Sequence, residues 1–458
     1  MKKTIIITSV ICVAVIMAAV VLGLAGGSGN SRVENTTAGT SQSTAASTTG
    51  APVIERCEHI YTGSFCSLCG AEVPTGEEYL SFRLLEDGTY SVGAKLVTNM
   101  PKRLIIPETY NGKPVTSVKK RGFIAAKQVE YVYIPEGVTA IEDEAFAECL
   151  NVYRFVFPKS LGSVGARAFE DCDTVTEMLF EGDVKLGEYA FHKCDSLKNV
   201  TFLGEVSEKS NSVANGSLQW TFKNCPNLKS VSFEGGGKVD FFYTFLGCEK
   251  LESVVLPDEL TAIGDSAFMG CKSLRKFTVP KTVSTLVGNA FANCPGLSLE
   301  LEAGNANLTD IGGCIVDNVR GTVVWCNNVS SISLANGVDT IALYAVSYQT
   351  LPEQYTIPSF ITKLQNCSFA YCKGLKNLVL SPNMTTVQSA AFYACEDLES
   401  VTLPKSITKI EYNAFAECKY LTKIYYEGTV EEWRAVEKNK LYGAVTVYCT
   451  DGEVSLFE

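Results

Sequence analysis

The chain has 458 residues, 46% of them apolar, and a formal net charge of −11 with only two histidines. Proteins that bind nucleic acid carry a basic surface for the phosphate backbone, so this acidic balance argues against nucleic acid as a partner. The apolar fraction is ample for a buried core, and ordinary solubility accounts for the excess of acidic residues.

Residues 1–26 have the pattern of a targeting segment. Lys2 and Lys3 precede an uncharged apolar run from Thr4 to about Gly26. Cationic residues at the front keep that end in the cytoplasm, so we expect the remainder to be exported. The run is long for the core of a signal peptide and long enough to span a membrane. The pattern fits either a cleaved signal peptide or an uncleaved signal anchor, in which the segment remains as an N-terminal apolar helix.

Residues 27–54 consist mainly of Ser, Thr, Gly, Ala and Asn, with almost no large apolar side chains. Such a composition cannot offset the entropy lost on ordering, so it predicts a flexible linker. The linker would hold a folded body away from the membrane if the preceding segment is not cleaved.

A small cysteine–histidine module follows at residues 55–73. It holds Cys57, His59, Cys66 and Cys69, four residues of the two types that close a tetrahedral zinc site in zinc-ribbon-like modules. Four protein ligands leave no open position, so the zinc would be structural rather than catalytic. A disulfide remains an alternative because exported cysteines are often oxidised, and free thiols are a third.

From about residue 74 to the end, a Phe three residues before a Cys recurs with a step of mostly 23 residues. A fixed period of this length is typical of stacked units that cannot bury their apolar faces alone. The pairs are Phe146/Cys149, Phe169/Cys172, Phe191/Cys194, Phe222/Cys225, Phe245/Cys248, Phe268/Cys271, Phe291/Cys294, Phe369/Cys372, Phe392/Cys395 and Phe415/Cys418.

The unit 251–271 illustrates one repeat. Val254 and Leu256 alternate with other residues and face inward on a short strand, which Pro257 ends because it has no N–H for the ladder. A second short extended piece ends at Ile263, and the Phe-x-x-Cys segment is expected to form a helical turn. We therefore predict a solenoid of parallel β-sheet coils with short helical turns.

The repeated cysteines fall in one column of this predicted stack. Neighbouring coils lie roughly 4.8 Å apart, within the Cα range of a disulfide, but side chains in one column point the same way. Buried reduced thiols are the alternative, because Cys also serves as a small core residue. We predict buried thiols, and neither alternative makes them catalytic.

The repeat resembles the leucine-rich repeat of BspA-type bacterial surface proteins, with its Leu-x-x-Val-x-Leu-Pro-x-x-Leu-Thr-x-Ile and Ala-Phe-x-x-Cys core. Segments 87–92 and 106–116 are similar to the family's N-terminal cap, at about 74–122, and segment 425–433 to its C-terminal cap, at about 419–458. Caps are required because an end coil would otherwise expose its apolar face and strand edge. The resemblance implies a leucine-rich-repeat solenoid over 74–458.

The period breaks between Cys294 and Phe369. Two short apolar runs, 311–316 and 322–326, flank a turn and predict a β-hairpin inserted at about 305–330. It resembles a hairpin that the same family often carries.

The outward strand positions form two columns whose middle is small and rich in hydroxyl groups. Tyr131, Tyr133 and Arg154 lie toward the N-terminal end. Because aromatic residues and Arg carry much of the energy of protein interfaces, we predict that a partner binds there. A generic solvated face is the alternative.

The sequence contains no recognisable catalytic constellation: it lacks a phosphate-binding Gly loop, a nucleophile elbow and a His–Glu metal pair. His192, next to Phe191, is expected at the surface. The resemblance implies an exported, non-catalytic surface protein that binds host or matrix proteins in adhesion. The alternatives are a passive structural or spacer protein and, less favoured, an enzyme.

Overall fold

The computed structural model describes residues 61–62, 65–66, 72–209, 217–334, 337–439 and 445–456. The chain divides into two compact units, Met1–Glu58 and His59–Glu458. The targeting segment 1–26 and the linker 27–54 lie outside the described residues. No helix in the described part of the chain is both long and apolar enough to cross a membrane.

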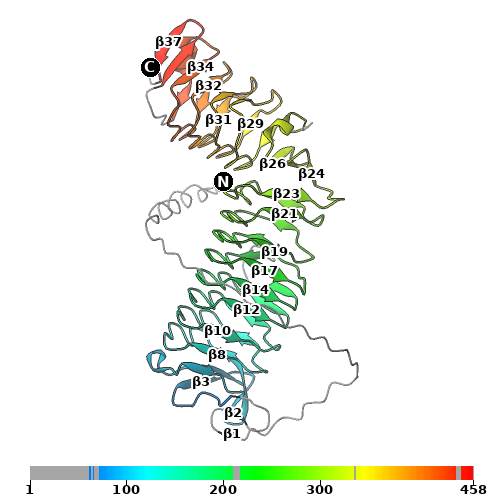
Figure 1. Ribbon diagram of the computed structural model, residues 1–458, viewed down its shortest axis with the longest axis vertical. Helices are drawn as coiled ribbons and strands as arrows, with labels where there is room; N and C mark the ends of the chain where they lie inside the picture. Colours follow the sequence, from blue (N-terminus) through cyan, green and yellow to red (C-terminus); the bar gives the residue numbers. More distant parts are fainter. Residues whose placement is uncertain are drawn as a thin grey trace, which may run out of the picture. The chain divides into compact units, whose positions relative to one another are not determined.

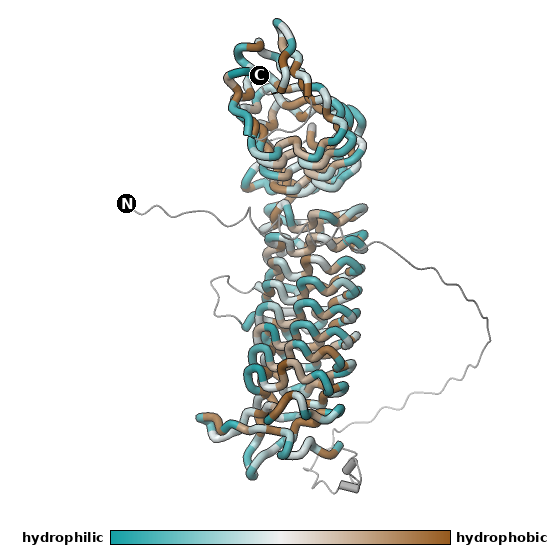
Figure 2. Tube along the Cα trace, turned by 90° about the vertical axis from the view of Figure 1, so that its left-hand side faces the viewer, coloured by the Kyte–Doolittle hydropathy of each residue, from teal (hydrophilic) through white to brown (hydrophobic). Residues whose placement is uncertain are grey.

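The second unit is a solenoid in which most coils contribute two short parallel strands and one turn (Figure 1). Hydrophobic and hydrophilic stretches recur at the same place in successive coils (Figure 2). The first strands of the coils are β5 (Arg103–Ile105), β8 (Tyr131–Tyr133), β10 (Arg154–Val156), β12 (Glu177–Phe180), β14 (Asn199–Phe202), β17 (Ser230–Phe233), β19 (Ser253–Val255), β21 (Lys276–Val279), β23 (Ser298–Leu301), β28 (Gln354–Thr356), β30 (Asn377–Val379), β32 (Ser400–Leu403), β34 (Lys423–Tyr426) and β36 (Thr446–Cys449).

The second strands form another row of parallel pairs, in which like positions of successive coils are in register. They are β7 (Lys113–Val118), β9 (Ala140–Ile141), β11 (Ser163–Val164), β13 (Val184–Leu186), β15 (Val206–Glu208), β16 (Ser217–Gln219), β18 (Asp240–Phe242), β20 (Ala262–Ile263), β22 (Thr285–Leu286), β27 (Thr340–Ile341), β29 (Lys363–Leu364), β31 (Thr386–Val387), β33 (Lys409–Ile410) and β35 (Glu437–Lys438).

Antiparallel pairs occur at both ends of this unit, where they cover the terminal coils. β3 (Leu80–Leu84) pairs with β4 (Tyr90–Ala94), β6 (Thr109–Tyr110) pairs with β7, and β37 (Gly452–Ser455) pairs with β36. A separate hairpin joins β1 (Tyr61–Thr62) to β2 (Phe65–Cys66). A short 3₁₀ helix, η2 (Val97–Asn99), lies between β4 and β5.

The prediction of helical turns around each Phe is wrong. In the first complete turn, the amides of Arg121, Phe123 and Ala125 donate to carbonyls of the next coil at 2.8–2.9 Å. Arg121 and Ala125 have positive φ angles of 55°. Around each later Phe of the repeat, and around Val346, the residue two before, the residue two after, or both also have positive φ. The left-handed residues at this spacing aim alternate amides at the next coil, while the amides between them bond three residues back within the turn, so no continuous helix forms.

One α-helix occurs in the described part of the chain, α2 (Val430–Ala435). Thr429 and Glu432 form a capping box at its start, in which each side chain accepts from the other residue's backbone N–H. The helix buries Trp433 against Tyr426, with ring centroids 5.4 Å apart. This packing closes the apolar end of the last coils.

The phenylalanines of the repeat form a buried ladder, as the sequence predicts. The rings of Phe146, Phe169 and Phe191 are fully buried, and neighbouring rings stack with centroids 5.8 and 5.6 Å apart. The same stacking continues from Phe191 to Phe291 and from Phe369 to Phe415. In the intervening stretch, Val346 takes the place of Phe and is also buried.

The ten column cysteines are unbridged, and nine of them are buried, which confirms the prediction of buried thiols for those nine; Cys418 is half-buried. The thiol of Cys149 donates to the carbonyl of Phe123 in the preceding coil at 3.2 Å. All ten column cysteines make this bond, to Phe or, for Cys372, to Val346. Each thiol therefore ties two coils together.

The stretch between the two blocks of repeats contains an antiparallel sheet. β24 (Leu308–Asp310) pairs with β25 (Cys314–Asp317), and β25 pairs with β26 (Thr322–Cys326), both antiparallel. β26 also pairs in parallel with β27. A 3₁₀ helix, η3 (Val329–Leu334), follows. The sheet thus rejoins the second-strand row of the repeats that follow.

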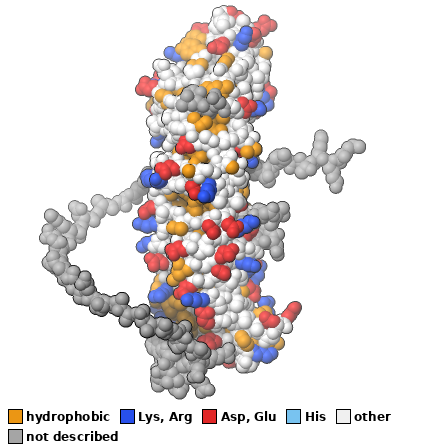
Figure 3. Space-filling view, turned by 90° about the vertical axis from the view of Figure 1, so that its right-hand side faces the viewer, with side chains coloured by type: hydrophobic (Ala, Val, Ile, Leu, Met, Phe, Trp, Pro, Cys, Tyr) orange, Lys and Arg blue, Asp and Glu red, His pale blue; other side chains and the backbone are white. Residues whose placement is uncertain are grey.

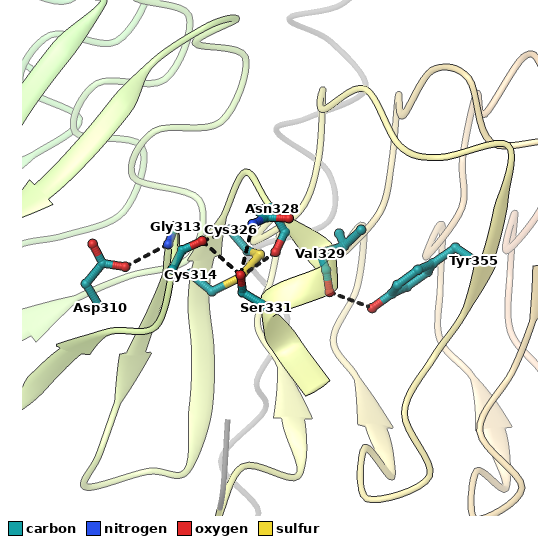
Figure 4. Close-up of a disulfide and its surroundings, with 9 residues drawn as sticks. Asp310, Gly313, Cys314, Cys326, Asn328, Val329, Ser331 and Tyr355 are labelled. Atoms are coloured by element: carbon teal, nitrogen blue, oxygen red, sulfur yellow. Dashed lines mark hydrogen bonds between the residues drawn. A yellow bond between two sulfur atoms is a disulfide. The ribbon is translucent and has the colours of Figure 1, made fainter. Parts of the chain in front are cut away.

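A disulfide joins Cys314 and Cys326, which lie directly opposite each other on β25 and β26 (Figure 4). The pairing was not predicted from the sequence. The available signal was that these two cysteines lie outside the Phe-x-x-Cys period and at matching positions of the predicted hairpin.

We expect loss of this disulfide to destabilise the insert. The bond closes a loop with a sequence separation of 12 residues, and loops of that size stabilise by about 3 kcal/mol in the chain-entropy model. Cys314→Ser with Cys326→Ser should lower the free energy of unfolding of the surrounding coils by about 2–3 kcal/mol, measured by native-state hydrogen exchange. Peptide mapping without reductant should recover 314 linked to 326, whereas recovery of both as free thiols would contradict the assignment.

Candidate functional site: the strand face

We call the outward side of the first strands the strand face. Along β14, Val200 and Phe202 are buried whereas Asn199 and Thr201 point outward and are half-buried. This period of two places two outward columns on the face, in register from coil to coil. Figure 3 shows acidic and basic side chains interspersed on one side of the molecule, without a large patch of one sign.

Tyr131, Tyr133 and Arg154 lie together on this face. Arg154 on β10 pairs in register with Tyr131 on β8, and Tyr133 lies two residues further along the same strand. Arg154 is exposed, while both tyrosines are half-buried. The structure thus brings the three predicted residues into one patch, which we call the N-terminal patch.

Two residues that were not predicted from the sequence, Arg103 and Glu72, complete this patch. Arg103 on β5 pairs in register with Tyr131, and its guanidinium carbon lies 4.1 Å from the centroid of the Tyr131 ring. Arg103 in turn donates two hydrogen bonds to the Glu72 carboxylate. Arg103 could have been found from the sequence, because Leu-Ile-Ile-Pro at 104–107, which follows it, resembles the first strand of each repeat.

This arrangement fixes the geometry of the patch. Burial raises the pKa of Tyr131, and Glu72 acts in the same direction. The phenol is therefore neutral at physiological pH and available as a hydrogen-bond donor. Stacking by Arg103 holds one face of the ring, so Tyr131 is a pre-ordered contact rather than a free side chain.

Most of the predicted zinc site lies outside the described residues, namely Cys57, His59 and Cys69. Cys66 is in β2, where it pairs with Tyr61 across the short hairpin. Within the described residues, no group of three or more His, Cys, Asp or Glu side chains is arranged to hold a metal ion. The zinc site therefore remains a prediction from the sequence.

His192 is buried, with 8% of its surface exposed, so its expected place at the surface is wrong. Its Nδ1 shares a hydrogen bond of 2.8 Å with Glu170, which also accepts from Arg167 at 3.0 Å. The ring of Tyr189 lies edge-on at 5.2 Å. Glu170 belongs to the preceding coil, so a contact between coils, which the position of His192 within its own repeat does not reveal, sets the environment of the imidazole.

We expect His192 to titrate below its ordinary pKa of 6.5, since burial lowers that pKa more than Glu170 raises it. The folded state then holds a neutral imidazole, and the stability it contributes is present above pH 6.5 and lost as the pH falls. With only two histidines in the chain, NMR titration of the imidazole C–H signals resolves the site. A midpoint at or above the ordinary value for His192, assigned with His192→Asn, would contradict this prediction.

The coil architecture and the outward strand face define the class of this protein as a leucine-rich-repeat solenoid. The family model of the BspA-type leucine-rich repeat region matches in six copies, over residues 116–233, 211–298 and 323–434. These matches span more than half of the chain, which therefore belongs to the BspA-type leucine-rich-repeat family. Comparison with curated proteins found no match.

Several solved structures are similar. A leucine-rich cell surface protein from Faecalibacterium prausnitzii A2-165 is 23% identical over 80% of this chain and 98% of its own, with a TM-score of 0.59. A leucine-rich repeat protein from Bacteroides ovatus is 18% identical over 82% of this chain and 90% of its own, with a TM-score of 0.45. The pneumococcal vaccine antigen PcpA is 17% identical over 82% of this chain and 93% of its own, with a TM-score of 0.44. At these identities, the first similarity establishes the fold.

Proposed function

We propose that this chain is an exported, non-catalytic protein of the cell surface that binds other proteins through its strand face. The observation that carries the proposal is the N-terminal patch, where Tyr131, Tyr133 and Arg154 share one outward surface. Aromatic and Arg side chains dominate binding energy at protein interfaces, and ring stacking by Arg103 reduces the entropy lost on binding.

Two further features support export. The apolar run behind Lys2 and Lys3 has the order of charges that directs a chain outward. The similar protein from Faecalibacterium prausnitzii is described as a cell surface protein. The protein would be tethered to the membrane by the N-terminal segment if that segment is uncleaved, and secreted if it is cleaved.

Binding of the purified full chain to extracts of extracellular matrix and host-cell surface proteins tests the proposal. We expect saturable binding that weakens by about 30-fold in a Tyr133→Ala, Arg154→Ala variant, as for the loss of an interface anchor. Lys276→Ala is the matched control, because this exposed residue lies on the strand face in the middle of the stack. Absence of saturable binding would favour the passive spacer instead.

For the module at 55–73, we propose a structural zinc held by Cys57, His59, Cys66 and Cys69. The spacing of these residues supports it, and the β1–β2 hairpin turns the chain just before Cys66. We expect elemental analysis of the full chain to find about one zinc per molecule, lost in a Cys66→Ser, Cys69→Ser variant. A chain without metal, whose cysteines are recovered as a disulfide or as free thiols, would exclude zinc.

A further inference from the structure

A second feature of the strand face lies toward the C-terminal end, on β30, β32 and β34. It is a shallow depression with a volume of about 310 Å³. In one column, Asn377, Ser400 and Lys423 are in register across the three strands. In the other column, Val379, Thr402 and Tyr425 are in register. The depression is separate from the N-terminal patch and lies in the last repeats.

Two exposed tyrosines border the depression. Tyr425 stacks on Tyr448 of the following coil, with ring centroids 5.4 Å apart and an angle of 25° between the planes. Its neighbour in the preceding coil is Thr402, which is too short to cover the other face of the ring. Tyr425 is 41% exposed and Tyr420 is 64% exposed, and both line the depression. The space therefore has aromatic borders.

Polar groups are available beside these rings. Ser400 donates to the side-chain oxygen of Asn377 at 2.7 Å, which orients the amide and leaves its nitrogen without a partner in the described part of the chain. The hydroxyl of Thr422 also lines the depression. Glu399 and Lys423 add one acidic and one basic group, so the lining carries no net charge.

We propose that this depression binds a neutral hexopyranose, such as the terminal sugar of a glycan. A pyranose ring presents C–H groups on one face, which pack on an open aromatic face, and hydroxyl groups around its edge. The amide of Asn377 and the groups of Glu399 and Lys423 supply the matching donors and acceptors. An anionic ligand would require an excess of cations, and an apolar ligand would leave these polar groups unpaired.

The expected affinity is low, because the site is open and small. A ligand of this size reaches a dissociation constant on the order of 1 mM when its contacts are ordinary. Repeated sugars on a surface would raise the apparent affinity through multivalency. This inference does not rest on export or on protein binding by the N-terminal patch.

Saturation-transfer NMR on the full chain tests the proposal with the methyl glycosides of glucose, galactose, mannose and N-acetylglucosamine as probes. We expect transfer to at least one glycoside. Tyr425→Ala and Asn377→Ala should each weaken its binding by at least about 10-fold. Tyr425→Phe keeps the ring face and should preserve binding. Tyr153→Ala is the control, because Tyr153 is 50% exposed and lies outside the depression.

Three outcomes would overturn the proposal. One is no transfer to any glycoside well above 1 mM. The second is binding that persists in the Tyr425→Ala, Asn377→Ala double variant. The third is binding of a protein partner through Tyr425 that none of the glycosides competes with. Both substituted side chains are at least partly exposed, so circular dichroism should show an unchanged fold.

Discussion

Phe169→Ala is expected to lower the free energy of unfolding by about 3–5 kcal/mol. The ring is fully buried and stacks on Phe146 and Phe191, while Phe155 meets it edge-on at 5.0 Å. Truncation removes contacts with two neighbouring coils at once and leaves a cavity that the β ladders on either side prevent from collapsing. Urea unfolding monitored by circular dichroism measures the loss.

The effect should also be local, because each coil of a solenoid contacts only its neighbours. Native-state hydrogen exchange should show the largest loss of protection in the coils from Phe146 to Phe191. Leu179→Ala is the control: this side chain is 48% exposed on the strand face, so we expect a change within about 0.5 kcal/mol. Equal destabilisation by the two substitutions would refute the role of the ladder.

The cysteine column should make the solenoid sensitive to alkali. Burial is the main cause that raises the pKa of eight column thiols above the ordinary value of 9.0, for example to about 12 for Cys149, Cys248 and Cys294. A side-chain hydrogen bond with Cys372, together with burial, raises the pKa of Cys395. The folded state keeps these protons when the unfolded state has lost them. The stability they contribute is therefore complete below pH 9.0 and declines as the pH rises toward the folded pKa values.

The size of the effect follows from the number of thiols. One pH unit above the unfolded pKa costs up to about 1.4 kcal/mol for each thiol that unfolds, so several coils together lose an amount comparable to the stability of a domain. Urea titrations with a reductant present, at intervals between about pH 8 and about pH 11, measure the slope.

Cys248→Ala provides the matched test for this slope. It removes one buried thiol, whose partner is the carbonyl of Phe222 at 3.0 Å. The variant should lose stability at neutral pH. Above pH 9.0 its free energy of unfolding should fall less steeply with pH, because about one proton fewer is released on unfolding. A slope identical to that of the unchanged chain would mean that Cys248 does not remain protonated in the folded state.

The period of the repeat was sufficient to predict the solenoid, its inward strand positions and the burial of the Phe and Cys columns. This follows from one physical constraint: like positions of successive coils meet, so a residue type repeated every 23 residues must pack against itself. The same register predicted that Tyr131 and Arg154 are neighbours on the strand face. For these features, spacing along the chain is equivalent to position in space.

Only the tertiary structure decided the features that depend on unlike residues in adjacent coils. Alternate amides around Phe123 bond to the next coil instead of closing a helix, and Glu170 of the preceding coil shares a hydrogen bond with the buried His192. Arg103 covers Tyr131 from the cap, and Tyr420 and Tyr425 border a depression lined by residues of neighbouring coils. The period of the sequence therefore determined the stack. The turns of the stack, its buried polar groups and its candidate binding surfaces depend on contacts between adjacent coils. These contacts cannot be predicted from the sequence of one repeat.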